Sequence, residues 1–271
     1  MFFYNKNGDD MKRILFTGSR SGIAKATIDK LKTMDYYIYA TVENEKQLEA
    51  MHRMYKEDNN VESFVLDVTK KEDRNKVESL DIDILVCNAA VSYGGSLTEI
   101  DVNLVRDTYE INVFSSLELI QLTFKLMMRK KQGKIIIMSS LAGIYPLSFI
   151  GSYASSKASL IKIAQTLKKE IDMLDVNIDV CLILPGFYYT GFNQVMFENK
   201  YPAMNIDSYF KSQIETLRNR ESFIHNFIEK KRLDSIVRQL LLAIQNNTGR
   251  FLYKSPFSQA VFAKLYSLCK E

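Results

Sequence analysis

Tyr153 and Lys157 lie four residues apart, and Ser140 lies thirteen residues upstream of Tyr153, at the end of an apolar run. In a helix, residues at i and i+4 share one face, so the ammonium of Lys157 can approach the phenol of Tyr153. A nearby positive charge lowers the pKa of a phenol from about 10 toward the range useful to a general acid or base. Ser140 can hydrogen-bond a carbonyl oxygen. These three residues predict a centre that moves a proton while a hydride moves.

A glycine-containing turn near the N-terminus predicts a nucleotide site. Residues 12–16 resemble a short buried strand, and residues 17–24, TGSRSGIA, then open a helical stretch. Glycines in a strand-to-helix turn let the backbone approach a pyrophosphate, and the helix N-terminus offers free N–H groups to it. The turn stands at the start of an alternating β/α chain, which is the context that this motif requires.

Together these motifs resemble the short-chain dehydrogenase/reductases, in the branch whose glycine motif reads T-G-x-x-x-G-x-G. The resemblance runs from Arg13 to about Thr190. After the glycine turn, the family's landmarks follow in order: Asp67-Val68, Asn88-Ala89-Ala90, Ile111-Asn112-Val113, Ser139-Ser140-Leu141-Ala142-Gly143, Tyr153-Ala154-Ser155-Ser156-Lys157, Pro185-Gly186 and Thr190. The resemblance implies a Rossmann fold and an NAD(P)-dependent oxidoreductase that interconverts a carbonyl and an alcohol.

The resemblance also assigns four catalytic residues. Ser140 binds the substrate oxygen, and Tyr153 exchanges a proton with it as general acid or base. Lys157 lowers the pKa of Tyr153 and binds the nicotinamide ribose. Asn112 holds a water molecule that connects Lys157 to solvent.

The cofactor site implied by the resemblance is spread along the chain. In the family, Asp67 holds the adenine, and Thr190 lies at the nicotinamide carboxamide. Ala24 and Ala90 each replace a family glycine, which puts cofactor affinity in doubt more than the chemistry. The expected cofactor-binding residues are Gly18, Ser19, Arg20, Ser21, Gly22, Ile23, Asp67, Val68, Asn88, Ala89, Tyr153, Lys157, Pro185, Gly186 and Thr190.

Cofactor choice depends on the end of the second expected strand. NAD-preferring members of the family usually carry an Asp at the position of Val42, and an apolar residue there removes a barrier to NADP. Members that prefer NADP often have Arg next, where this chain has Glu43. Arg20 in the glycine turn could supply the positive charge, and Glu43 either pairs with it or points to solvent. The balance favours NADP(H) over NAD(H).

The composition indicates one α/β domain. A chain of 271 residues with 46% hydrophobic content can bury a full core. The net charge of +4 is modest and its charges are scattered, so no nucleic-acid surface is expected.

Neither a metal site nor a membrane span is expected. Cys87, Cys181 and Cys269 lack metal-site spacing, and two of them fall at strand positions, as core thiols do. No signal peptide and no transmembrane segment is evident. We therefore expect a cytoplasmic protein.

The first ten residues differ from the rest and form an expected N-terminal tail. Met11 directly precedes the first expected strand, so translation could start at Met11 instead of Met1. The intact mass of the natively expressed protein tests this, because a species that carries Met1 would rule out a start at Met11.

Alternating elements from residue 11 to residue 271 predict a doubly wound parallel sheet of seven strands with helices on both faces. The expected strands are 12–17, 36–42, 61–67, 82–87, 133–139, 177–184 and 250–254. The expected helices are 22–34, 45–57, 70–79, 98–131 with a break near Asn112, 153–173 and 233–246. A last helix after Pro256 is expected to seal the sheet edge with Phe257, Val261, Leu265 and Leu268. A dimer contact and a membrane-surface contact are the alternatives for that helix.

Residues 187–232 are expected to form a substrate lid. This stretch is rich in aromatic residues, and Ile144, Tyr145, Leu147 and Phe149 are expected to add to the same wall. An apolar pocket suits a lipid-like, steroid-like or aromatic substrate. A non-catalytic NADP(H)-binding regulator or scaffold is the alternative function. The family resemblance implies a homodimer or homotetramer formed through helices 113–131 and 153–173.

Overall fold

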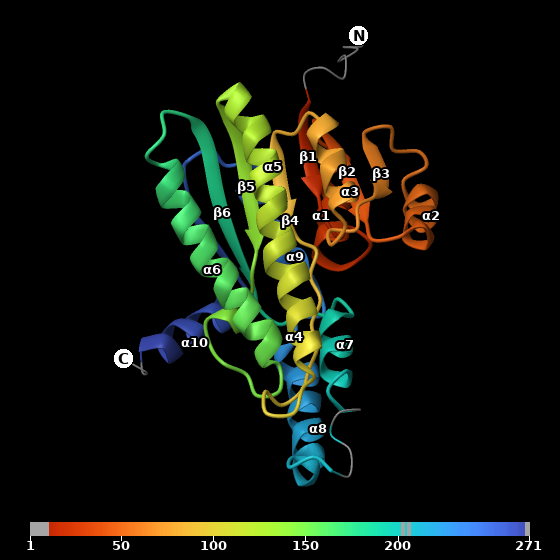
Figure 1. The fold of residues 1–271 in the computed structure, drawn as a ribbon, viewed down its shortest axis with the longest axis vertical. Coiled ribbons are helices and arrows are strands. Elements are labelled where there is room, and N and C mark those ends of the chain that lie inside the picture. Colours follow the sequence, from red (N-terminus) through yellow and green to blue (C-terminus); the bar gives the residue numbers. More distant parts are fainter. Residues whose placement is uncertain (1–10, 202–203, 205–206, 269–271) are drawn as a thin grey trace.

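Seven strands form one sheet in the order β3-β2-β1-β4-β5-β6-β7, and every neighbouring pair is parallel. The computed structural model in Figure 1 describes residues 11–201, 204 and 207–268. The strands are β1 (Lys12–Phe16), β2 (Tyr36–Val42), β3 (Val61–Val65), β4 (Ile84–Cys87), β5 (Gln132–Met138), β6 (Asn177–Pro185) and β7 (Leu252–Ser255). The predicted single-domain Rossmann fold is confirmed.

Side chains of the central strands alternate between two hydrophobic cores, one on each face of the sheet. In β5, Ile135 and Ile137 belong to one core, and Ile136 and Met138 belong to the other. Helices cover both faces, so both sets are buried, as expected for a parallel sheet (Figure 1). One face carries α5 (Ser115–Lys130) and α6 (Gly151–Ile171), and the other carries α1 (Gly22–Leu31) and α9 (Asp234–Gln245). The remaining helices of the first half are α2 (Glu45–Met54) and α3 (Lys71–Asn75), with a 3₁₀ turn over Lys76–Ser79.

The long helix predicted over 98–131 is three consecutive elements. It begins as α4 (Val102–Tyr109), since Asp101 caps the helix by accepting a hydrogen bond from the Asn103 N–H at 2.8 Å. A π turn over Glu110–Phe114 follows, and α5 continues from there. The expected break near Asn112 is therefore a π turn, a feature frequently found at functional sites.

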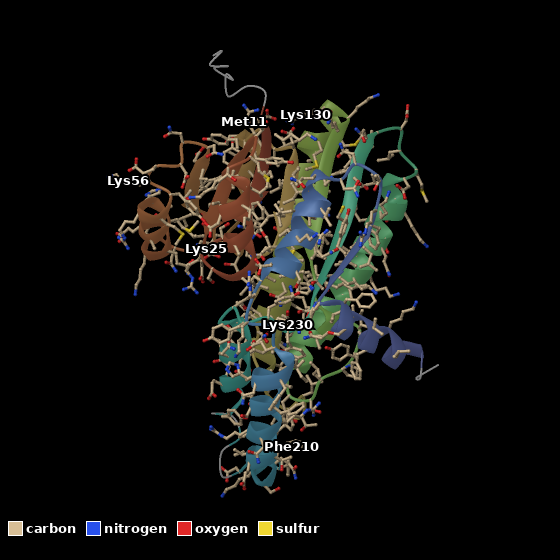
Figure 2. All side chains as sticks on the ribbon, turned by 180° about the vertical axis from the view of Figure 1, so that it is seen from behind. Met11, Lys25, Lys56, Lys130, Phe210 and Lys230 are labelled. Carbon is tan, nitrogen blue, oxygen red and sulfur yellow. The ribbon has the colours of Figure 1, made fainter. Side chains whose placement is uncertain are left out.

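The lid segment, residues 187–232, contains helices that the sequence analysis did not predict. They are α7 (Phe192–Glu198) and α8 (Ile214–Phe223), with a 3₁₀ turn at Lys211–Gln213 and a π turn at Ile224–Ile228. In α8, Leu217 is the buried residue, so no apolar stripe marks the helix in the sequence. In Figure 2 the segment extends away from the sheet, with Lys230 at its root and Phe210 toward its far end.

The last helix, α10 (Phe257–Leu268), packs differently from the prediction. It is buried on the side of Ala260 and Ala263, whereas Phe257, Val261 and Leu265 are exposed, so this stripe does not seal the sheet edge. Small residues allow close packing, which explains why the alanine side faces the protein. The Leu268 side chain, Cys269 and the predicted tail 1–10 lie outside the described residues. Among the described residues, no helix is long and apolar enough to cross a membrane.

Candidate active site

A cavity of about 900 Å³ opens at the carboxyl ends of the central strands. This is where open α/β sheets bind their ligands. One end of the cavity is lined by the glycine turn between β1 and α1, and the other by apolar residues of the lid segment and of the loop after β5.

The glycine turn fits a dinucleotide because its backbone lies close to the neighbouring segments. Gly18 has φ +67°, and a Cβ placed there would lie 2.9 Å from the Cα of Ala89. Gly22 has φ +65°, and its Cβ would lie 3.3 Å from the Cβ of Thr190. Both positions favour glycine, which leaves the N-terminus of α1 open to a phosphate group.

Asn88 holds this turn against the end of β4. Its Nδ2 donates to the carbonyl oxygens of Thr17 and Gly18 at 3.0 and 2.9 Å. In return, the Thr17 hydroxyl accepts hydrogen bonds from the N–H groups of Asn88 and Ala89, both at 2.9 Å. Asn88 therefore shapes the cofactor end of the cavity and also lines it.

The predicted catalytic trio comes together in the wall of the cavity. Tyr153 and Lys157 lie one turn apart on α6, with the Lys157 Nζ 5.6 Å from the centre of the Tyr153 ring. The Ser140 hydroxyl donates to the Pro185 carbonyl oxygen at 3.4 Å and accepts from the Ala142 N–H at 3.1 Å, and it lies close enough to Tyr153 to lower the pKa of its phenol. Gly143 makes this approach possible, because a Cβ there would lie 2.8 Å from the carbonyl carbon of Lys157.

Burial controls the protonation of the trio. It raises the pKa of Tyr153 to about 12, against the opposing effect of the nearby Ser140 hydroxyl. It lowers the pKa of Lys157 to about 8, and the Lys157 Nζ donates to the carbonyl oxygen of Met138 at 3.0 Å. The expected lowering of the Tyr153 pKa is thus not found, because loss of solvent outweighs the effect of the Ser140 hydroxyl. Tyr153 is therefore protonated at neutral pH.

Asn112 is buried beneath the cavity, not in its wall. Its Oδ1 accepts from the Val91 N–H at 2.8 Å, and its Nδ2 donates to the Val91 carbonyl oxygen and to the Ser156 hydroxyl, both at 3.0 Å. These bonds fix Val91, which does line the cavity. The expected water held by Asn112 stays a prediction.

At the adenosine end, Glu43 is exposed to solvent, which is one of the two arrangements considered from the sequence. Its carboxylate accepts a hydrogen bond from the Gln47 Nε2 at 3.2 Å, and the Gln47 Oε1 accepts one from the Glu43 N–H at 3.2 Å. Val42 is buried, whereas Arg20, Glu43 and Gln47 line the cavity. The sequence analysis missed Gln47. The signal was the spacing Asn44-x-x-Gln47, which resembles a helix capping box, and the Asn44 side chain does accept from the Gln47 N–H.

Most of the expected cofactor residues line the one cavity. Ser19 is the exception: its hydroxyl donates to the carbonyl oxygen of Phe16 at 3.3 Å, and its N–H bonds to Thr41, so it braces the turn from beneath. The residues placed in the wall as expected are Gly18, Arg20, Ser21, Gly22, Ile23, Asp67, Val68, Asn88, Ala89, Tyr153, Lys157, Pro185, Gly186 and Thr190.

The substrate end is mostly apolar. Its wall includes Tyr145, Leu147, Ile150, Phe187, Phe192 and Met196. The Phe192 and Tyr153 ring centroids are 5.4 Å apart, so the lid segment touches the predicted proton donor directly. Ile144 and Phe149 were expected in this wall and lie outside it, and the sequence analysis missed its polar members Ser92, Asn193 and Asn199.

The two described cysteines are core thiols and do not line the cavity. Cys87 and Cys181 are buried, and burial raises the pKa of each thiol to about 12, as expected for inert core thiols. The described residues contain no group of His, Cys, Asp and Glu side chains placed to hold a metal ion.

Comparison with known proteins agrees with this geometry. The sequence profile of the short chain dehydrogenases matches residues 12–201. The NADPH-dependent 3-dehydrocapnine reductase of Ornithobacterium rhinotracheale is 30% identical over 188 residues, which cover 65% of this chain and 65% of that protein. The 3-ketodihydrosphingosine reductase of Bacteroides thetaiotaomicron is 27% identical over 260 residues, covering 93% of this chain and 90% of that protein.

Solved structures share the fold across almost the whole chain. A short-chain dehydrogenase/reductase from Burkholderia phymatum in complex with NAD superposes with a TM-score of 0.79, at 19% identity, over 96% of this chain and 94% of the other. Actinorhodin polyketide ketoreductase with NADPH gives 0.77, at 18% identity, over 91% and 96%. The chain belongs to the short-chain dehydrogenase family of NAD(P)-dependent oxidoreductases.

Proposed function

We propose that this protein uses NADPH to reduce a ketone on a long, mostly apolar molecule. The apolar substrate end of the cavity supports this, and so do two relatives named as reductases of 3-dehydrocapnine and of 3-ketodihydrosphingosine. An apolar wall with a few polar groups is typical of sites for small apolar ligands.

The observation that carries the proposal is the place of Tyr153 in the cavity. Its ring lies against Phe192 of the apolar wall, 5.4 Å between centroids, and it lines the same cavity as Ser140 and the glycine turn. A carbonyl group held there is within reach of a proton donor and of a cofactor at the same time. A binding protein without turnover would not need that junction, so the non-catalytic alternative gains no support from the site.

The chemistry follows from the residues in place. NADPH, when bound, supplies the hydride to the carbonyl carbon. Ser140 hydrogen-bonds the carbonyl oxygen, and Tyr153 gives its proton to the same oxygen as negative charge develops there. The Lys157 ammonium stabilises the Tyr153 oxygen after the proton has left. Oxidation of the alcohol runs the same steps in reverse.

The preference for NADPH rests on the adenosine end. Arg20 lines the cavity and can bind a 2′-phosphate, and Val42 offers no carboxylate to repel it. Glu43 stands against this preference, but its bonds with Gln47 hold its carboxylate on the α2 side. One relative is named as NADPH-dependent, which points the same way.

An assay of ketone reduction tests the proposal. Purified protein is given 3-ketodihydrosphingosine with NADPH or NADH, and loss of the reduced cofactor is followed by absorbance. We expect turnover with NADPH and slower turnover with NADH. Turnover of short polar ketones, with none of the long-chain ketone, would contradict the proposed substrate class.

A further inference from the structure

A buried carboxylate closes the base of the lid segment. The Glu229 side chain is 2% exposed. It accepts hydrogen bonds from the Asn193 Nδ2 at 2.8 Å, from the Gln194 Nε2 at 3.1 and 3.2 Å, and from the His225 Nδ1 at 2.8 Å. Hydrogen bonds to a charged acceptor are the stronger kind. One carboxylate therefore joins the start of the lid segment to its end.

The backbone around Glu229 shows that these two ends lie side by side. The Tyr189 N–H donates to the Lys230 carbonyl oxygen at 2.9 Å, and the Lys230 N–H donates to the Phe187 carbonyl oxygen at 3.0 Å. Figure 2 places Lys230 at the point where the lid segment meets the body of the protein. Asn193 adds a second bond there, from its Nδ2 to the Tyr188 carbonyl oxygen at 2.9 Å.

Residues 188–194, which Glu229 holds, include two residues of the cavity wall, Thr190 and Phe192. Thr190 lies against the glycine turn, at 3.3 Å from a Cβ placed on Gly22. Phe192 lies against Tyr153, with 5.4 Å between the ring centroids. A shift of residues 188–194 would therefore move the cavity wall at the glycine turn and at the proton donor together.

We propose that Glu229 is a positioning residue for the nicotinamide end of the cofactor. It does not line the cavity, and it acts by fixing Thr190 and Phe192 through Asn193 and Gln194. This inference rests on the proposed function, because it requires that the cavity binds NAD(P).

Binding measurements with Glu229→Gln test the proposal. Glutamine keeps the size of the side chain but removes its negative charge. Each carboxylate oxygen of Glu229 accepts from two donors, and the glutamine N–H₂ group would replace one of these oxygens. We expect the Kd of NADPH to rise by about fivefold. The Kd of adenosine 2′,5′-bisphosphate, which lacks the nicotinamide half, should stay unchanged. A general loosening of the fold would weaken the binding of both ligands.

Glu221→Gln is the matched control within the lid segment. Glu221 pairs with the buried Lys200 and accepts a hydrogen bond from the Tyr201 hydroxyl at 2.5 Å, away from residues 188–194. The ratio of the Kd of NADPH to the Kd of adenosine 2′,5′-bisphosphate should stay at the wild-type value in Glu221→Gln. Equal ratios in both variants, or an unchanged ratio in Glu229→Gln, would overturn the proposal.

If the wild-type protein binds neither NADPH nor NADH, the proposed function fails, and the inference fails with it. If Glu229→Gln does not fold, His225→Ala is measured in the same way, since it removes one donor to Glu229 and no residue of the cavity wall. It should shift the ratio in the same direction by a smaller factor, and an unchanged ratio would overturn the proposal.

Discussion

The two ends of the cavity are held in place by different means. At the cofactor end, main-chain geometry does most of the positioning: Gly18 and Gly22 adopt positive φ angles and the adjoining strands pair in register, while the Asn88 and Thr17 side chains bond the turn to the end of β4. At the substrate end, bonds between scattered side chains position the lid segment. Examples are the Glu229 cluster and the Tyr188 hydroxyl, which hydrogen-bonds Ser235 and Ser255, both at 2.7 Å.

This difference explains why one end is evident in the sequence and the other is not. A backbone requirement restricts residue type at a fixed spacing, and glycine is the clearest case. Side-chain bonds across the lid segment can be made by many residue pairs at many spacings. The lid segment can therefore vary with the substrate while the cofactor end keeps its motifs.

The largest expected effect comes from removing the proton donor where the two ends meet. Tyr153→Phe should reduce turnover by at least about 100-fold, the low end for general acid–base catalysis. NADPH binding should persist, because the glycine turn is untouched. Turnover and NADPH affinity are measured on the same preparation, and near-normal turnover would remove Tyr153 from the chemistry.

Gly143→Ala tests whether the main-chain geometry of the loop after β5 requires glycine at this position. The new Cβ would lie 2.8 Å from the Lys157 carbonyl carbon, a main-chain atom that cannot move away easily. We expect the free energy of unfolding to fall by about 2 kcal/mol, as for other overpacked sites. Denaturant unfolding measures it.

Gly249→Ala is the control, because Gly249 has φ +71° and nothing within 4 Å of its Cβ position. Its cost comes from conformation alone, about 1 kcal/mol. A cost for Gly143→Ala no greater than this would show that the contact with α6 does not matter.

The pH dependence of stability tests the cost of the buried Lys157. Burial lowers its pKa to about 8 from 10.5, so between these values the unfolded chain binds more protons than the folded one. Stability from this group therefore rises with pH across that window. Lys157→Met should be more stable than wild type near pH 7, by about 2 kcal/mol. The difference in the free energy of unfolding between Lys157→Met and wild type should shrink as the pH rises from about 8 to 10.5. A difference that does not change with pH would contradict the lowered pKa of Lys157.

The smallest effect is expected in the lid segment. Tyr201→Phe removes one hydrogen bond to Glu221, and neither residue lines the cavity. We expect the KM for a long-chain ketone to rise by about threefold, with kcat nearly unchanged. The effect is small because the lost hydrogen bond is partly exposed. An effect on kcat as large as that of Tyr153→Phe would erase the contrast between the two ends.

The sequence predicted the sheet and the shared cavity of Ser140, Tyr153 and Lys157 well, because both depend on local patterns. Buried apolar runs marked the strands, and the spacing of Tyr153 and Lys157 placed them on one face of α6. It did not show that the Ser19 hydroxyl bonds the Phe16 carbonyl oxygen beneath the turn, since spacing in a turn does not show which side chains point inward. It also missed the start of α4, where capping by Asp101 decides the boundary.

By itself, the sequence determined the parallel sheet, the glycine turn and the placement of Tyr153 one turn before Lys157. Only the tertiary structure decided the protonation of Tyr153, the partner of Glu43 and the role of Glu229 in closing the lid segment. The reason is physical. Backbone conformation and hydrophobic periodicity act over a few neighbouring residues, whereas burial and side-chain hydrogen bonds depend on which distant segments meet.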